Sequence, residues 1–116
     1  MSLISLMKHL LIIFSLLMSS YLSAASFTST CISESGRSQY DLELDTYSRD
    51  GTIRYRFAEQ DVFYKVHIDK VESDLIEGIA IFESSSSGES KGNPFKFTFD
   101  LKNNIFNELN ITAYCK

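Results

Sequence analysis

Histidine, the side chain most often used for acid–base chemistry near neutral pH, occurs once after residue 25, at position 67. His67 alternates with Lys65 and Asp69 in a strand-like run. No serine and carboxylate stand at a spacing that would make it the base of a nucleophilic site. A solvated strand histidine is therefore the favoured interpretation. We expect no catalytic residue and no enzyme activity.

Metal-binding patterns are equally sparse. Asp41, Glu43 and Asp45 recur at every second position and could present clustered oxygens to calcium. No loop with ligands at metal-binding offsets accompanies them, so a solvated strand face partly paired to Arg56 is favoured. Zinc lacks ligands, because the two cysteines of the chain are far apart and only His67 could join them. We expect neither a metal nor a cofactor.

A group of basic and aromatic residues is the most informative surface feature. Its members share the outward face of the predicted middle strands: Tyr47, Arg54, Arg56, Phe63, Lys65 and His67. Arginine and aromatic residues are enriched where proteins bind one another, which makes this set a candidate interaction patch. The alternative is that the arginines serve cross-strand ion pairs and Phe63 is an ordinary exposed apolar residue. The net charge of −4 argues against nucleic acid as the partner.

Period-two alternation of apolar and polar residues dominates the chain after residue 25 and predicts β-strands. The predicted strands lie within residues 27–33, 40–45, 53–57, 62–69, 76–83, 95–102 and 109–115. About seven antiparallel strands with one apolar face each form a meander, which buries its core by rolling into a small barrel or folding into a sandwich.

Turn residues between these runs predict the strand register. Asp50 and Gly51 form a strong type I′ hairpin signal that would set Leu44 opposite Phe57. A slip by one residue would place Leu44 beside Arg56, so the alternation and the turn specify the same register.

The later turns are predicted from composition. A turn at Glu59 and Gln60 would set Arg54 opposite Lys65, which is an unfavourable pair of like charges. Residues 84–94 form a polar, serine-rich loop, and residues 103–107 a turn or a short helix.

The two cysteines, Cys31 and Cys115, allow a single intramolecular disulfide. Both fall on the predicted inward faces of their strands. In a barrel of seven up-and-down strands the first and last strands run parallel, which would bring both cysteines to the same end. Free thiols or intermolecular bonds are the alternatives.

The first 25 residues have the features of a cleaved signal peptide. Lys8 gives a weakly positive start, residues 10–18 form an apolar core, and Ser23 and Ala25 supply the small residues before a cut at Ser26. An uncleaved anchor would need about 20 apolar residues. We therefore expect a mature domain of residues 26–116, periplasmic or secreted and without a membrane in its mature form.

The layout is similar to that of the small periplasmic inhibitors of c-type lysozyme, which are exported antiparallel β-barrels of similar length. That family carries a Ser-Gly-x-x-Tyr loop in the middle of its domain. The nearest match in this chain runs from Ser35 and Gly36 to Tyr40, one residue longer and close to the N-terminus. No inhibitory residue is assigned from it.

Three functions are compatible with these features. The leading hypothesis is an exported, non-enzymatic binding module that contacts another protein, of which an inhibitor of a hydrolase is one form. The second is a carrier of a small apolar ligand, suggested by Phe95, Phe97 and Phe99 on one strand face. The third is a small hydrolase. The oligomeric state is left open.

Overall fold

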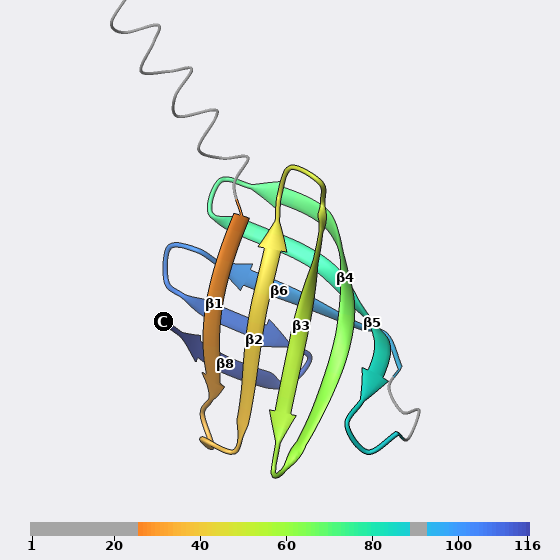
Figure 1. The fold of residues 1–116 in the computed structure, drawn as a ribbon. Helices are drawn as coiled ribbons and strands as arrows, with labels where there is room; N and C mark the ends of the chain where they lie inside the picture. The colour runs from red at the N-terminus through yellow and green to blue at the C-terminus, as the bar shows by residue number, and fades with distance from the viewer. Residues whose placement is uncertain (1–25, 89–92) are drawn as a thin grey trace, which may run out of the picture.

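Eight antiparallel strands make up the fold in the computed structural model, which describes residues 26–88 and 93–116. The predicted signal peptide, residues 1–25, lies outside the described residues. The strands are β1 (Ser26–Ser33), β2 (Ser38–Asp45), β3 (Asp50–Phe57), β4 (Gln60–Glu72), β5 (Leu75–Ser85), β6 (Phe95–Asp100), β7 (Ile105–Glu108) and β8 (Ile111–Cys115). Each strand pairs with its neighbours in the chain and β1 pairs with β8, so the sheet closes into a barrel (Figure 1). The expected all-β meander is confirmed as a barrel.

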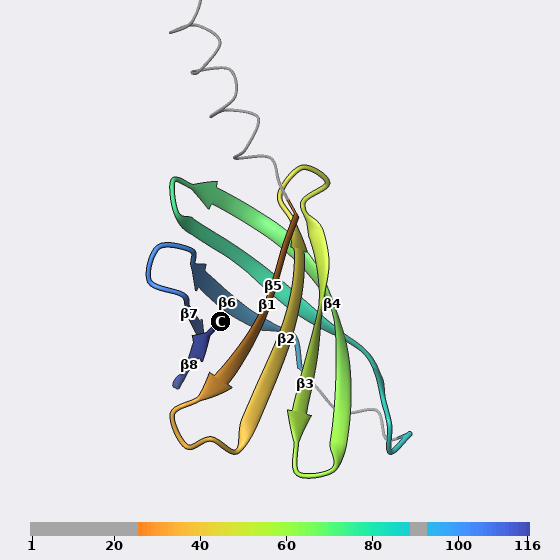
Figure 2. The same cartoon turned by 60° about the vertical axis from the view of Figure 1, so that its left-hand side comes forward.

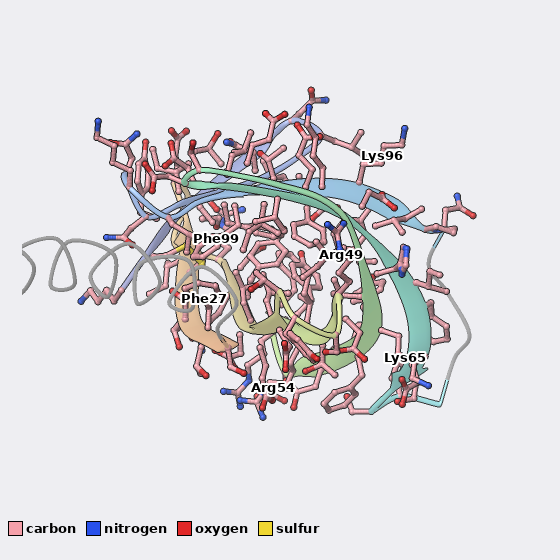
Figure 3. The ribbon with its side chains drawn as sticks, turned by 90° about the horizontal axis from the view of Figure 1, so that it is seen from above. Phe27, Arg49, Arg54, Lys65, Lys96 and Phe99 are labelled. Atoms are coloured by element: carbon pink, nitrogen blue, oxygen red, sulfur yellow. A yellow bond between two sulfur atoms is a disulfide. The ribbon has the colours of Figure 1, made fainter. Side chains whose placement is uncertain are left out.

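The core lies inside this barrel. In Figure 2, β1–β3 form one wall and β5 and β6 cross behind them at a steep angle. Figure 3, which looks down from above, shows Phe27 and Phe99 pointing into the interior. All strands contribute buried apolar side chains to the core: Cys31, Tyr40, Leu42, Leu44, Ile53, Val66, Ile68, Ile76, Ala80, Phe95, Phe97, Phe99, Phe106 and Ala113. No helix of membrane-spanning length and hydrophobicity occurs in the described part of the chain.

The count of eight strands, against about seven predicted, results from β7. The prediction of a turn or short helix at residues 103–107 holds as a turn for residues 103 and 104 but was wrong for residues 105–107, which belong to β7. The turn ends at Asn104, which has a positive φ of 56°, and β7 follows directly. The carboxylate of Asp100 accepts hydrogen bonds from the backbone N–H groups of Lys102 and Asn103, both at 3.0 Å. A side chain that bonds its own backbone in this way closes a tight turn.

The strand count changes how the cysteines meet. With eight strands, β1 and β8 run antiparallel, so the argument from parallel first and last strands was wrong. Cys31 nevertheless lies directly opposite Cys115, because the short β8 pairs only with the C-terminal end of β1. The predicted disulfide is present with an S–S distance of 2.04 Å.

The start of β8 also differs from its prediction. Leu109, expected on the inward face of the last strand, lies in the β7–β8 turn with a φ of 47° and is 84% exposed. Glu108, one residue earlier, faces inward instead, since it pairs with the buried Phe97 across β6 and β7. Only Ala113 and Cys115 of the predicted inward set pack in or against the core.

The first hairpin has a different register from the predicted one. Asp45 pairs with Asp50, so the turn comprises residues 46–49 and Leu44 lies opposite Gly51 rather than Phe57. The Asp45 carboxylate accepts hydrogen bonds from the backbone N–H of Tyr47 at 2.9 Å and of Ser48 at 3.1 Å. The shift covers an even number of residues, so the inward face of each strand stays as predicted.

Gly51 is therefore a strand residue and not a hairpin glycine. Its missing side chain is required by close approach, because a Cβ at this position would meet the backbone carbonyl oxygen of Glu43. The predicted type I′ turn at Asp50 and Gly51 was therefore wrong, and the glycine is required by close contact with β2 rather than by a positive φ.

The second hairpin turns at Ala58 and Glu59, one residue earlier than predicted. Arg54 consequently lies opposite Phe63 and Arg56 opposite Asp61. The unfavourable pairing of Arg54 with Lys65 does not occur. The predicted loop at residues 84–94 is shorter than expected, because β5 continues to Ser85, and residues 89–92 lie outside the described part.

Candidate functional site

The two arginines of the predicted patch are held in cross-strand ion pairs. The Nη2 atom of Arg54 lies 2.7 Å from Oδ2 of Asp41 on β2, and its Nε donates to the same oxygen at 3.1 Å. The Nε of Arg56 lies 2.9 Å from Oδ1 of Asp61 on β4. Such partly exposed pairs contribute little stability, but they neutralise the arginine charges. Both arginines therefore serve cross-strand ion pairs, which was the alternative interpretation of the predicted patch.

The other members of the predicted patch are spread along β3 and β4. Tyr47 lies in the β2–β3 turn, where it is 83% exposed. His67 lies opposite Asp50 in the β3–β4 ladder, near the same end of the hairpin. The Nε2 atom of His67 lies 3.7 Å from Oδ1 of Asp69. Arg56 lies next to the β3–β4 turn at the opposite end of the hairpin. The structure therefore places Arg54 directly opposite Phe63 but distributes the predicted residues from one end of the β3–β4 hairpin to the other.

Phe63 and Lys65 instead form a surface with the outward side chains of β5 and β6. Lys65 lies directly opposite Ile81, and Ile79 lies between His67 on β4 and Lys96 on β6. We call Phe63, Lys65, Ile79, Ile81 and Lys96 the β5 face. Figure 3 shows Lys65 and Lys96 at the outer side of the wall that includes β5. The apolar part is accessible, since Phe63 is 38% and Ile81 48% exposed.

The lysines of the β5 face differ from the other strand cations in making no ion pair within 4.0 Å. Arg54, Arg56 and Lys70 each lie within 4.0 Å of a carboxylate. Within residues 26–88 and 93–116, neither Lys65 nor Lys96 makes such a pair. The β5 face thus combines exposed apolar side chains with two lysines that make no close ion pair.

An open groove adjoins this face at Lys96. It has a volume of about 540 Å³ and runs over the outer surface of β5, β6 and β7. The exposed Leu109 lines it together with Glu77 and Thr98. Asp69 and Asn107 line it as well, so Leu109 is the exposed apolar side chain of a groove that is otherwise mainly polar.

Sequence reasoning missed Ile79, Ile81 and Lys96. One signal was present, because residues 79–82 form an unbroken apolar run, Ile-Ala-Ile-Phe, inside a chain that otherwise alternates. A strand that is apolar on both faces is typical of one covered on both sides. No signal in the sequence could place Lys96 opposite Ile79, since that pairing depends on the register of β5 and β6.

A second candidate lies in the interior, where β2 and β7 bring together a tyrosine and an acid. The hydroxyl of Tyr40 donates a hydrogen bond of 2.8 Å to Oε2 of Glu108. Burial raises the pKa of Glu108, and the bond from Tyr40 opposes that rise. Burial and the neighbouring Glu108 also raise the pKa of Tyr40 and of Tyr64. Tyr40 therefore stays protonated and acts as a donor.

Tyr40 of this interior pair is part of the packed core. The ring of Tyr40 contacts those of Tyr55 and Phe106, with centroids 5.0 and 4.7 Å apart. The phenylalanines that suggested a carrier pack in the same way, with Phe97 at 5.6 Å from Phe106. Phe95 lies at 4.9 Å from Tyr64. These rings pack against one another inside the barrel, as side chains do in small barrels.

Two of the three acidic residues of β2, Asp41 and Asp45, are engaged in local structure. Asp41 accepts bonds from Arg54, Thr30 and Gln39, and Asp45 closes the β2–β3 turn. Hydrogen bonds from the Ser48 and Tyr47 backbone lower the pKa of Asp45. In the described residues, no group of three or more His, Cys, Asp or Glu side chains could hold a metal ion.

The carboxyl of Glu108 makes stability depend on pH in a specific direction. Because its pKa is raised in the folded state, the folded protein binds this proton more tightly than the unfolded chain does. That contribution is fully present below the unfolded pKa of about 4.3 and is lost as the pH rises through the folded value. Glu108→Gln should keep an acceptor for Tyr40 and remove the titration. We expect the variant to gain stability over the wild type as the pH rises from 4 to 8.

Urea unfolding at a series of pH values measures this difference. Glu43→Gln, which removes an exposed carboxylate from β2, is the matched control and should show a smaller pH-dependent difference. A Glu108→Gln variant that is less stable than the wild type by the same amount at every pH would contradict the expectation.

Comparisons with known proteins find no matching family model, no similar curated protein and no similar solved structure. The segment that partly matches the Ser-Gly-x-x-Tyr loop lies only in part on the surface. Ser35 and Gly36 lie in the β1–β2 turn, but Tyr40 is fully buried inside the barrel. Function must therefore be argued from the surfaces of this chain.

Proposed function

We propose that the chain is an exported, non-enzymatic binding module that contacts another protein through the β5 face. The supporting observation is the position of Phe63 and Ile81, which are exposed on neighbouring strands beside the unpaired Lys65. Exposed aromatic and aliphatic side chains on a rigid sheet are effective anchors for a protein partner. The disulfide is consistent with an oxidising compartment outside the cytoplasm. Inhibition of a hydrolase is one form that such binding could take.

Replacing the apolar anchors should remove the partner. Phe63→Ser combined with Ile81→Ser deletes two exposed side chains and leaves the buried core unchanged, so the barrel should keep its fold. We expect proteins captured from the native envelope or culture fluid by the wild type to be lost from the variant, with at least about tenfold weaker binding, as for loss of a binding hot spot. Quantitative mass spectrometry of the captured proteins measures the loss.

The matched control removes equally exposed apolar side chains on the other side of the barrel. Ile32 and Tyr114 lie opposite each other on β1 and β8 and are 42% and 53% exposed. Ile32→Ser with Tyr114→Ser should retain the captured proteins. Equal retention by both double variants would show that the β5 face is not the contact surface.

A further inference from the structure

The β5 face carries charge in an arrangement that selects among protein partners. Lys65 lies opposite Ile81 on one side of β5, and Lys96 lies opposite Ile79 on the other. The two lysines are two strands and two residue positions apart. With strands spaced by about 4.8 Å and residues by about 3.3 Å, their Cα atoms are about 12 Å apart. They therefore lie at opposite corners of the apolar pair.

A partner that covers Ile79 and Ile81 must also cover at least part of these lysines. Burying an ammonium group without a counter-charge is costly, and neither lysine lies within 4.0 Å of a carboxylate in the part of the chain that the structure describes. Glu77 on β5 lines the same groove as Lys96, but it makes no ion pair with that lysine within 4.0 Å. Glu77 interacts with Lys70, and Glu83 lies at the bulge in the β4–β5 ladder, outside the pair of lysines.

We infer that the β5 face binds an acidic protein segment with an apolar centre, in which two carboxylates about 12 Å apart flank aliphatic or aromatic side chains. An extended segment with acidic residues four positions apart has this spacing. The inference rests on the proposed function and specifies the partner class of the same surface. It also separates this face from the arginines of β3, whose charges are already met by Asp41 and Asp61.

Short peptides test the inference without knowledge of the natural partner. The probe is acetyl-Glu-Leu-Phe-Leu-Glu-amide, titrated into the isotope-labelled exported protein and followed by NMR. The comparison peptides are acetyl-Lys-Leu-Phe-Leu-Lys-amide and acetyl-Glu-Ser-Ser-Ser-Glu-amide. We expect the acidic apolar peptide alone to shift the amide signals of the β5 face and to dissociate as salt rises, because screening weakens exposed charge pairs.

Charge reversal provides the decisive variant. Lys65→Glu with Lys96→Glu should weaken the acidic peptide about tenfold, as two exposed ion pairs are exchanged for repulsion, and should improve binding of the lysine peptide. Lys102→Glu with Lys116→Glu, outside the β5 face, is the matched control and should change neither affinity.

Three results would overturn the inference: no binding of the acidic peptide at millimolar concentration, equal binding of the lysine peptide, or sedimentation showing that copies of the chain occupy this face themselves. These outcomes differ from failure of the proposed function. If Phe63→Ser with Ile81→Ser abolishes capture while the peptides show no preference for charge, the docking surface stands and the acidic partner class does not. If that double variant keeps every captured protein, the docking surface itself is wrong.

Discussion

Replacing Cys31 and Cys115 by alanine is expected to lower the free energy of unfolding by about 4–5 kcal/mol. The bond joins residues separated by 84 positions and spans nearly the whole barrel. In the chain-entropy account, it stabilises the fold by restricting the unfolded chain, and the restriction grows with the length of the closed loop. A small domain has a total stability of about 5–15 kcal/mol, so the loss is a large part of it.

Thermal unfolding followed by circular dichroism measures this loss. For a domain of this size a change of about 4–5 kcal/mol corresponds to a fall in Tm of roughly 20 °C or more. The wild type treated with a reductant should behave like the alanine variant, and the variant itself should not respond to the reductant. Wild type and variant with the same Tm would mean that the bond contributes nothing to stability.

The disulfide was predictable because two cysteines permit a single pairing and both fall on inward faces. The topology that brings them together was not. It depends on β8 being short and pairing only with residues 31–33 of β1, and chain alternation does not specify where a closing strand begins to pair. A correct bond was therefore predicted together with an incorrect orientation of the last strand.

Faces were predicted more reliably than registers. Alternation assigned Leu44, Ile53 and Phe97 to the interior, and all three are buried. The register of the first hairpin failed at its turn, where Asp45 binds the backbone of the following residues and the turn begins earlier than predicted. Asp100 binds the backbone in the same way and ends β6 two residues before the predicted end of that strand. The hydrogen bonds from the backbone to Asp45 favour a turn directly after that residue, whereas the Asp50-Gly51 dipeptide had predicted a two-residue turn further along the chain.

In the candidate site, too, the outward faces of residues were predicted correctly but their neighbours on adjacent strands were not. Phe63 and Lys65 were recognised because each is a conspicuous residue on an outward position of β4. Ile79, Ile81 and Lys96 complete their surroundings, yet they come from strands that follow β4 in the chain. Their proximity depends on the bulges in the β4–β5 ladder as well as on its register. A patch that crosses strands is set by registers, and registers were the weakest part of the sequence prediction.

Phe106→Ala is expected to lower the free energy of unfolding by about 3–5 kcal/mol, as for other fully buried phenylalanines. Phe106 has no exposed surface, and its ring lies 4.7 Å from that of Tyr40 and 5.6 Å from that of Phe97. Denaturant unfolding measures the loss. Asn107→Ala, on the outward side of the same strand, is the control and should cost about 0.5–1 kcal/mol, since it removes one exposed hydrogen bond to Thr112.

This variant also decides between the two accounts of residues 103–107. A surface turn or a short helix would leave Phe106 near solvent, and its truncation would then cost no more than that of Asn107. A large difference between the two variants requires a strand whose alternate side chains enter the core, because in a strand successive residues point to opposite faces. The inward position of Glu108 has the same cause, because Glu108 lies two residues after Phe106 on the same side of β7. The Tyr40 hydroxyl donates a hydrogen bond to the carboxyl group that this alternation places in the interior.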